Sequence, residues 1–155
     1  MSEAPQLEVD VEDVSGAAGN PSAAEFQRWT AAALAGRREQ AEVSIRIVGE
    51  TEGAELNARY RSKTGPTNVL SFPAELPAGV PLPMVGDLVI CAPVVAREAH
   101  AQGKEPSAHW AHLTVHGCLH LIGYDHEHEA GATEMEALET AILAGLGFPD
   151  PYTPA

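Results

Sequence analysis

Two stretches of the chain alternate between apolar and polar residues with a period of two. They are residues 6–14, QLEVDVEDV, and residues 42–48, EVSIRIV. This alternation is typical of a β-strand with one buried face. Residues 67–73 and 84–91 are rich in β-branched and aromatic side chains and also predict strands. The last of these is almost continuously apolar after Asp87, which favours a central place in the sheet.

Between and after these strands the apolar residues recur with helical spacing. Asn20 and Pro21 predict a helix start in which Asn20 caps the first turn, and the Thr51 hydroxyl is expected to cap a second helix. Five helices are expected, over residues 20–36, 51–63, 93–103, 106–123 and 129–145. The side chains expected to face inward are those of Phe26, Trp29, Leu34, Leu56, Tyr60, Met135, Leu138 and Ile142.

This order of elements predicts an α+β domain, with a small mixed sheet of about four strands and about five helices packed around it. A chain of 155 residues is expected to form one domain over residues 1–155. It contains no run of roughly 18 apolar residues and no apolar leader at the start, so a cytoplasmic protein is expected. Its two cysteines, Cys91 and Cys118, lie in apolar settings and are expected to be reduced and buried.

Charge is distributed unevenly along the chain. The formal net charge is −13, which taken alone disfavours a polyanionic partner. Seven of the nine basic residues, however, lie between Arg28 and Lys63, and residues 105–155 carry eight acids and no lysine or arginine. A locally positive strip therefore remains compatible with the overall charge, and so does an acidic protein with scattered basic residues.

Three histidines form the strongest chemical signal in the sequence. His116 and His120 are four residues apart in a predicted helix, so they lie on one face with about 5–6 Å between their Cβ atoms. Gly123 is expected to end the helix in a positive-φ conformation, and the returning loop would bring His126 to the same ion. Three imidazoles without a fourth protein ligand suit a catalytic zinc ion. The metal site is therefore predicted on a central helix and the loop that follows it.

The spacing is that of the metzincin peptidases, with one departure. Gly117 stands where those enzymes carry the glutamate that acts as general base, which disfavours a peptidase. His112 shares a helical face with His116, but His126 is favoured as third ligand because three successive turns cannot easily surround one tetrahedral ion. His112 is then expected to contact a ligand or the substrate. The other two histidines of this region, His109 and His128, are expected at the surface or at helix ends.

Two motifs together resemble the YbeY family of bacterial endoribonucleases. One is His116-Gly-x-Leu-His-Leu-x-Gly-Tyr-Asp-His126, and the other runs from Leu56-Asn57 through Tyr60-Arg61-x-Lys63 to Pro66-Thr-Asn-Val-Leu-Ser-Phe-Pro73. A weaker match is Gly86-Asp-Leu-Val-Ile90. The resemblance spans roughly residues 56–126.

The resemblance implies a zinc-dependent endoribonuclease that cleaves single-stranded RNA, with roles in 16S ribosomal RNA 3′-end maturation and ribosome quality control. It implies that His116, His120 and His126 hold one Zn²⁺ ion and that Arg61 is the functional arginine. Arg59 and Lys63 are expected either to contact flanking phosphates or to form a solvated helix end. The expected partners are ribosomal RNA, the small ribosomal subunit and a basic ribosomal protein.

Two other functions remain open from the sequence. A non-catalytic ribosome-assembly factor would use the zinc ion only for stability, and a metallopeptidase is less favoured because of Gly117. Asp87 could orient a ligand histidine, although an ordinary aspartate near a strand start is the favoured interpretation.

Overall fold

The computed structural model describes residues 6–74, 83–124 and 129–152. Its centre is one four-stranded mixed sheet with the order β1-β2-β4-β3. The first three strands in this order are parallel, and β3 runs antiparallel to β4. The strands are β1 (Gln6–Asp13), β2 (Gln40–Val48), β3 (Val69–Pro73) and β4 (Met84–Cys91). The mixed sheet and the inner position of the apolar strand β4 confirm the predictions.

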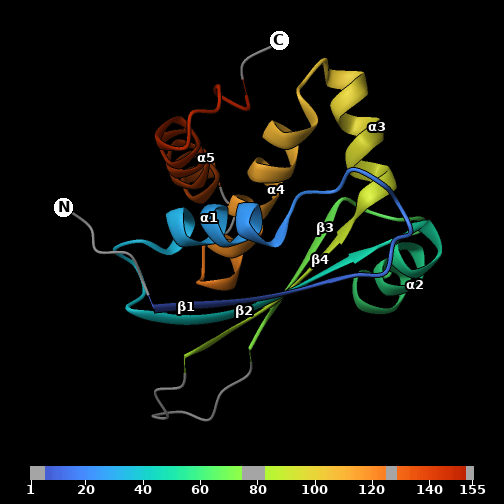
Figure 1. Cartoon of the computed structure of the whole chain (residues 1–155), viewed down its shortest axis with the longest axis horizontal. Helices are drawn as coiled ribbons and strands as arrows, with labels where there is room; N and C mark the ends of the chain where they lie inside the picture. Colours follow the sequence, from blue (N-terminus) through green and yellow to red (C-terminus); the bar gives the residue numbers. More distant parts are fainter. Residues whose placement is uncertain (1–5, 75–82, 125–128, 153–155) are drawn as a thin grey trace.

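Five helices surround this sheet (Figure 1). They are α1 (Ala23–Leu34), α2 (Glu50–Arg61), α3 (Ala92–Gln102), α4 (Pro106–Leu121) and α5 (Glu129–Gly145). Helices α1 and α4 pack on one face of the sheet, α5 packs on the outside of α4, and α2 lies on the other face. Helix α4 contacts α1, α3, α5, β3 and β4, so it is the central helix of the fold. Within the described residues no helix has the length and apolar character needed to cross a bilayer.

The larger hydrophobic core lies between the sheet and the helices α1 and α4. Phe26 and Trp29 of α1 are fully buried, as predicted, and Phe26 packs edge to face against Trp29 and Trp110 with ring centroids 5.5 and 5.9 Å apart. Residues Leu88 and Ile90 of β4 complete this core from the sheet side. A smaller core on the other face contains Val48, Leu70, Val89, Cys91 and Val94. Helix α4 is thus fixed by the larger core.

The helix starts differ from the predicted ones. Helix α1 is capped by Ser22, whose hydroxyl accepts a hydrogen bond from the Glu25 amide while the Glu25 carboxylate accepts one from the Ser22 amide. Asn20 instead donates to Asp13 across the turn, at 2.8 Å. Helix α2 begins after Gly49 without a side-chain cap, and Thr51 already lies inside it. The predicted caps at Asn20 and Thr51 are therefore wrong.

Helix α2 is only loosely covered. Leu56 packs against the smaller core, but the predicted burial of Tyr60 is wrong, because this side chain is 57% exposed. The helix ends at Ser62, which adopts a left-handed conformation with φ 53°. The end of α2 therefore presents Tyr60 and Arg61 at the surface.

Helix α4 approaches the sheet closely at Gly117. A Cβ atom at this position would lie 2.7 Å from Leu88 Cδ2 of β4, closer than non-bonded carbon atoms pack. Any larger residue here would require the buried Leu88 side chain to shift. The consequence is that α4 is held against β3 and β4 at the turn that carries His116 and His120.

Candidate active site

One cleft of about 570 Å³ brings together three of the residues predicted from sequence. Arg61 reaches it from the end of α2, and His116 and His120 reach it from α4. The full lining consists of Tyr60, Arg61, Asn68, Val69, Leu70, Ser71, Phe72, His116 and His120. Strand β3 therefore forms the wall between the arginine and the two histidines.

The two cleft histidines lie one helical turn apart, as the spacing predicted. Their ring centroids are 4.8 Å apart with an interplanar angle of 80°. Gly123, which follows α4, has a positive φ of 106°, as expected for the residue that turns the chain away. The predicted third ligand, His126, lies outside the described residues. Arg59 and Lys63 are exposed and are not among the residues that line the cleft.

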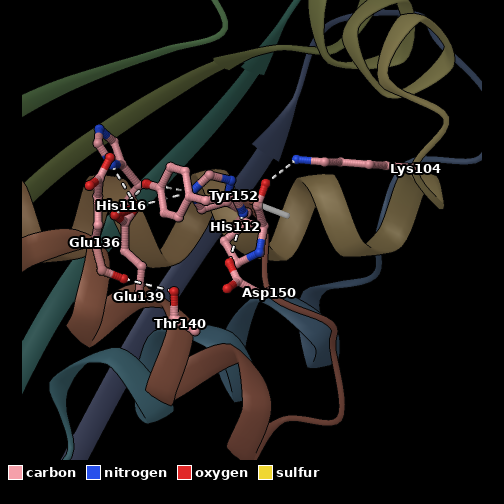
Figure 2. A network of polar contacts seen from close by, with 9 residues as sticks. Lys104, His112, His116, Glu136, Glu139, Thr140, Asp150 and Tyr152 are labelled. Atoms are coloured by element: carbon pink, nitrogen blue, oxygen red, sulfur yellow. Dashed lines mark hydrogen bonds and ion pairs between the residues drawn. The ribbon is translucent and has the colours of Figure 1, made fainter. Parts of the chain in front are cut away.

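A buried glutamate stands directly behind His116. Glu139 of α5 is 0% exposed, and its Oε1 atom lies 2.7 Å from His116 Nδ1 and 3.0 Å from His112 Nε2. Its other oxygen, Oε2, accepts a hydrogen bond of 2.7 Å from the Tyr152 hydroxyl. Figure 2 shows His112, His116 and Tyr152 gathered around the carboxylate. His116 thus contacts Glu139 of α5, and Glu139 in turn is hydrogen-bonded to Tyr152 in the segment after α5.

Electrostatics keep this glutamate ionised. Burial alone would raise the pKa of Glu139, but the hydrogen bonds from His112, His116 and Tyr152 outweigh burial and lower this pKa to about 2. Burial and the adjacent Glu139 charge both raise the pKa of Tyr152, so its hydroxyl keeps its proton. Because the carboxylate is acceptor-only, both histidine nitrogens that face it carry hydrogen.

Three of these four side chains, those of His112, His116 and Glu139, also form a candidate metal cluster. One ligand atom from each of His112, His116 and Glu139 lies within 4.8 Å of the others, a spacing that could hold an ion. The described residues therefore offer two arrangements around His116, one facing the cleft with His120 and one facing α5 with Glu139. In both, imidazole nitrogen is the main donor, which suits zinc and other borderline transition metals.

Three other predicted residues lie elsewhere. His109, predicted at the surface or at a helix end, lies near the start of α4 but is not at the surface, because it is 4% exposed and its Nε2 atom lies 2.9 Å from Glu98 Oε1. Cys118 is a free, buried thiol whose pKa is raised to about 12 by burial, so it is a neutral core residue. Asp87 is exposed and lines a hollow on the other side of the sheet, away from the cleft histidines. His128 lies outside the described residues.

The hollow that contains Asp87 is larger, about 810 Å³. Its polar lining includes Asp10 and Glu12 of β1, and its one cation, Arg46, is paired with Glu12 and Glu52. The Arg46 Nε atom lies 2.6 Å from Glu52 Oε2. The charged part of this lining is therefore mostly acidic, and its cation is already paired with carboxylates.

Comparison with known proteins identifies the family. The sequence profile of endoribonuclease YbeY matches residues 15–147. The chain is 58% identical over 151 residues to the endoribonuclease YbeY of Xanthomonas axonopodis pv. citri (strain 306), covering 95% of this chain and 94% of the relative. It is 56% identical over 151 residues to that of Stenotrophomonas maltophilia (strain K279a), with the same coverage. The chain belongs to the endoribonuclease YbeY family. The family resemblance and the endoribonuclease class predicted from the sequence are therefore confirmed.

A more distant likeness concerns the fold. The solution structure of a Thermotoga maritima protein aligns with a TM-score of 0.56 and 20% identity, and the match covers 94% of this chain and 99% of that one. The same fold is therefore found in a protein of low sequence identity.

Glu139 and Tyr152 are the residues of this site that sequence reasoning missed. One signal was present, because Glu139 follows the buried Met135 by four residues and interrupts the apolar side of α5. A glutamate among core positions is rarely buried unless it is paired. What the sequence did not indicate was its partner, since 23 residues separate it from His116.

Proposed function

We propose that this protein is a zinc-dependent endoribonuclease that cleaves single-stranded RNA in 16S ribosomal RNA 3′-end maturation and ribosome quality control. The observation that carries the proposal is the cleft in which Arg61 and the pair His116 and His120 line the same cavity. A Lewis acid and a fixed cation both stabilise the charge that develops when a phosphodiester is cleaved, and this cleft combines imidazole ligands with a guanidinium.

The metal ligands in this proposal are His116, His120 and His126. His116 and His120 fit the group, because they lie in one cleft with their rings 4.8 Å apart. A zinc ion bound by three imidazoles supplies a Lewis acid and lowers the pKa of water to about 7. The identity of the ion rests on the nitrogen donors and on the family resemblance.

Arg61 is assigned the role of binding the scissile phosphate. Its guanidinium is planar, stays charged at all physiological pH values and can pair with two phosphate oxygens. Negative charge that develops on phosphorus is then stabilised by a group already in position. Arg59 and Lys63, exposed at the same helix end, are assigned to the phosphates on either side.

The aromatic lining supports a preference for unpaired RNA. Tyr60 is 57% exposed and packs edge to face against Phe72, with ring centroids 5.0 Å apart, and both line the cleft. Single-stranded RNA is commonly bound by stacking of its splayed bases on exposed aromatic rings. Tyr60 is therefore assigned as a stacking platform next to the phosphate held by Arg61.

The ribosomal role, with the small subunit as partner, follows from the family. A net charge of −13 favours recruitment through a basic ribosomal protein rather than through general attraction to RNA. In this proposal the protein works in the cytoplasm on the small subunit.

Two alternatives have different structural requirements. A peptidase of the metzincin type needs a glutamate at position 117, and a Cβ atom there would lie 2.7 Å from Leu88 Cδ2. A non-catalytic assembly factor would need a closed metal site, for which the buried cluster of His112, His116 and Glu139 is the candidate. The cleft that opens beside His116 favours catalysis over this second alternative.

Incubation of the purified protein with a single-stranded RNA or with casein, each with and without a chelator, tests the proposal. We expect cleavage of RNA that the chelator abolishes and added zinc restores, and no cleavage of casein. Intact RNA under all conditions would contradict the proposal in favour of an assembly factor. Chelator-sensitive cleavage of casein would instead indicate a peptidase. Analysis of the RNA ends then identifies the attacking group, because a 2′,3′-cyclic phosphate would exclude direct attack by water.

A further inference from the structure

We propose that Glu139 is a positioning residue that fixes the ring orientation and tautomer of His116, and that Tyr152 fixes Glu139 in turn. The inference rests on the proposed metal-binding role of His116 and adds to it a connection between the cleft and the C-terminal part of the fold. No nucleophile, metal ligand or substrate contact is assigned to Glu139 itself.

The first argument is the burial of the carboxylate. Glu139 is 0% exposed, and it is the one carboxylate that is fully buried among the described residues. Burying a charge is costly unless the charge is paired and hydrogen-bonded. Here every contact that compensates for the burial comes from the group around His116, namely two imidazoles and one phenol. The carboxylate is therefore arranged to hold these side chains rather than to face solvent.

The second argument concerns the protons of His116. Because the carboxyl oxygen Oε1 of Glu139 lies 2.7 Å from Nδ1 and serves as the acceptor, that nitrogen carries the hydrogen. In a neutral imidazole the other nitrogen, Nε2, then has the lone pair, and it is the atom through which His116 would bind an ion. Metal-binding histidines commonly donate their second N–H to a carboxylate in this way. The hydrogen bond thus selects the metal-binding tautomer.

The third argument distinguishes this role from direct metal binding by Glu139. The distances from Glu139 Oε1 to His116 Nδ1 and His112 Nε2 are 2.7 and 3.0 Å, which are hydrogen-bond lengths. Two ligands of a tetrahedral zinc ion, each bound at 2.0–2.1 Å, would lie about 3.3 Å apart. His112 and Glu139 are also absent from the residues that line the cleft. The geometry therefore favours hydrogen bonding over coordination.

Tyr152 and His112 hold the carboxylate from its other sides. The Tyr152 hydroxyl donates to Oε2 at 2.7 Å, and the ring of Tyr152 lies edge to face against His112 with centroids 5.3 Å apart (Figure 2). Lys104, which precedes α4, donates to the carbonyl oxygen of Pro151 at 2.5 Å. These contacts fix the segment around Tyr152 against α4 and α5. Disruption of this segment should therefore lower the affinity of the proposed metal site for zinc.

The test compares zinc affinity across four variants and one benchmark. The variants are Glu139→Ala, Glu139→Gln, Tyr152→Phe and the control Glu134→Gln, which removes an exposed charge from the same helix. His116→Ala provides the benchmark for the loss of a ligand. Dissociation constants come from competition with a chromophoric chelator, and thermal unfolding of each metal-free protein checks that it folds.

We expect Glu139→Ala to weaken zinc binding by about 10–100-fold, the range found when the outer partner of a metal ligand is removed. Glu139→Gln keeps an acceptor for Nδ1–H and should recover part of that loss. Tyr152→Phe should weaken binding less than Glu139→Ala, and Glu134→Gln should leave it unchanged. In ¹⁵N spectra of the metal-free proteins, His116 should carry its hydrogen on Nδ1 in the wild type and in Glu139→Gln, and lose this preference in Glu139→Ala.

Three outcomes would overturn the proposal. Unchanged zinc affinity in both Glu139 variants and in Tyr152→Phe would remove the positioning role while leaving the metal site intact. A loss in Glu139→Gln as complete as in His116→Ala would make Glu139 a ligand. Unchanged zinc binding in His116→Ala would instead refute the underlying metal site, and this result is separate because it does not involve Glu139. If Glu139→Ala does not fold, Glu139→Gln and Tyr152→Phe still decide the question.

Discussion

The molecule has two neighbouring hollows that meet at Tyr60 and Phe72, and the smaller one contains the residues proposed to act on RNA. The larger hollow, about 810 Å³, is lined by Asp10, Glu12 and Asp87, and its Arg46 is paired with carboxylates. The smaller cleft, about 570 Å³, contains His116, His120 and an arginine that belongs to no ion pair found among the described residues, Arg61. Both hollows are open, so the charge of their linings and not their size distinguishes them.

The difference lies in what each surface offers a phosphodiester. An acidic lining repels a polyanion, and a cation already neutralised by two carboxylates adds little attraction. An unneutralised guanidinium beside imidazole nitrogens offers both a phosphate ligand and metal ligands. The predictions below test this contrast in order of decreasing effect.

The largest effect is expected for His116→Ala. Loss of a metal ligand should weaken zinc binding by more than about 100-fold, the upper end of the range for outer partners, and abolish RNA cleavage with it. Chelator competition and a gel-based cleavage assay measure the two quantities. His100→Ala, at an exposed position on α3, is the matched control and should behave like the wild type. Retention of full cleavage by His116→Ala would place the active site elsewhere.

Arg61→Ala should reduce RNA cleavage by at least about tenfold, and up to the 10²–10³-fold typical of a group that stabilises transition-state charge. Folding and zinc content should not change, because Arg61 is exposed and lies at the end of α2. Single-turnover rates at saturating zinc measure the effect, and the exposed Arg28→Ala of α1 serves as the charge-matched control. Equal rates for both variants would exclude Arg61 from the mechanism.

Tyr60→Ala should weaken RNA binding by about 1–3 kcal/mol, the contribution of one base stacked on an aromatic ring. Fluorescence anisotropy with metal-free protein, which leaves the RNA intact, gives the affinity. Tyr60→Phe keeps the ring and should retain most of the binding. A phenylalanine variant as weak as the alanine variant would point to the hydroxyl group instead of stacking.

Arg59→Ala and Lys63→Ala should each weaken RNA binding only a few-fold at low salt. If each residue contacts one phosphate, each variant should make the slope of log affinity against log salt concentration shallower by about 0.7, the value for one contact to a single strand. Titrations at several salt concentrations give this slope. An unchanged slope would show that these residues form a solvated helix end.

The smallest effect is expected in the larger hollow. Asp10→Asn removes a charge from the acidic hollow and should change RNA cleavage by less than about twofold, since exposed charges beyond a Debye length of about 8–10 Å are largely screened. The same cleavage assay applies. A larger increase would mean that RNA also passes over this face, and the contrast between the two hollows would weaken.

The sequence was sufficient for features that depend on local periodicity. The strands β1 and β2 follow from alternation alone, and the inner position of β4 follows from its apolar run. The joint position of His116 and His120 follows from their spacing on one helix. The placement of Arg61 in the same cleft could be expected only from the family resemblance, because no local rule relates the end of α2 to α4.

The errors concern partners that are distant in the chain. Asn20 does not cap α1, because its side-chain amide donates to Asp13 instead. His109 is buried and not exposed, because it pairs with Glu98 of α3. Glu139 was missed for the same reason, since its role depends on how α5 packs on α4. Such contacts are set by tertiary packing, which residue preferences and spacing describe only weakly.

The contact between Gly117 and Leu88 has an evolutionary consequence. A mutation that introduced the peptidase glutamate at position 117 would have to push the side chain of Leu88 aside, because even the first carbon of that glutamate would lie 2.7 Å from it. Leu88 is fully buried in the larger core, so this displacement would disturb the packing there and lower stability. The peptidase glutamate would therefore carry a cost in stability in this fold, although the histidine spacing is the same.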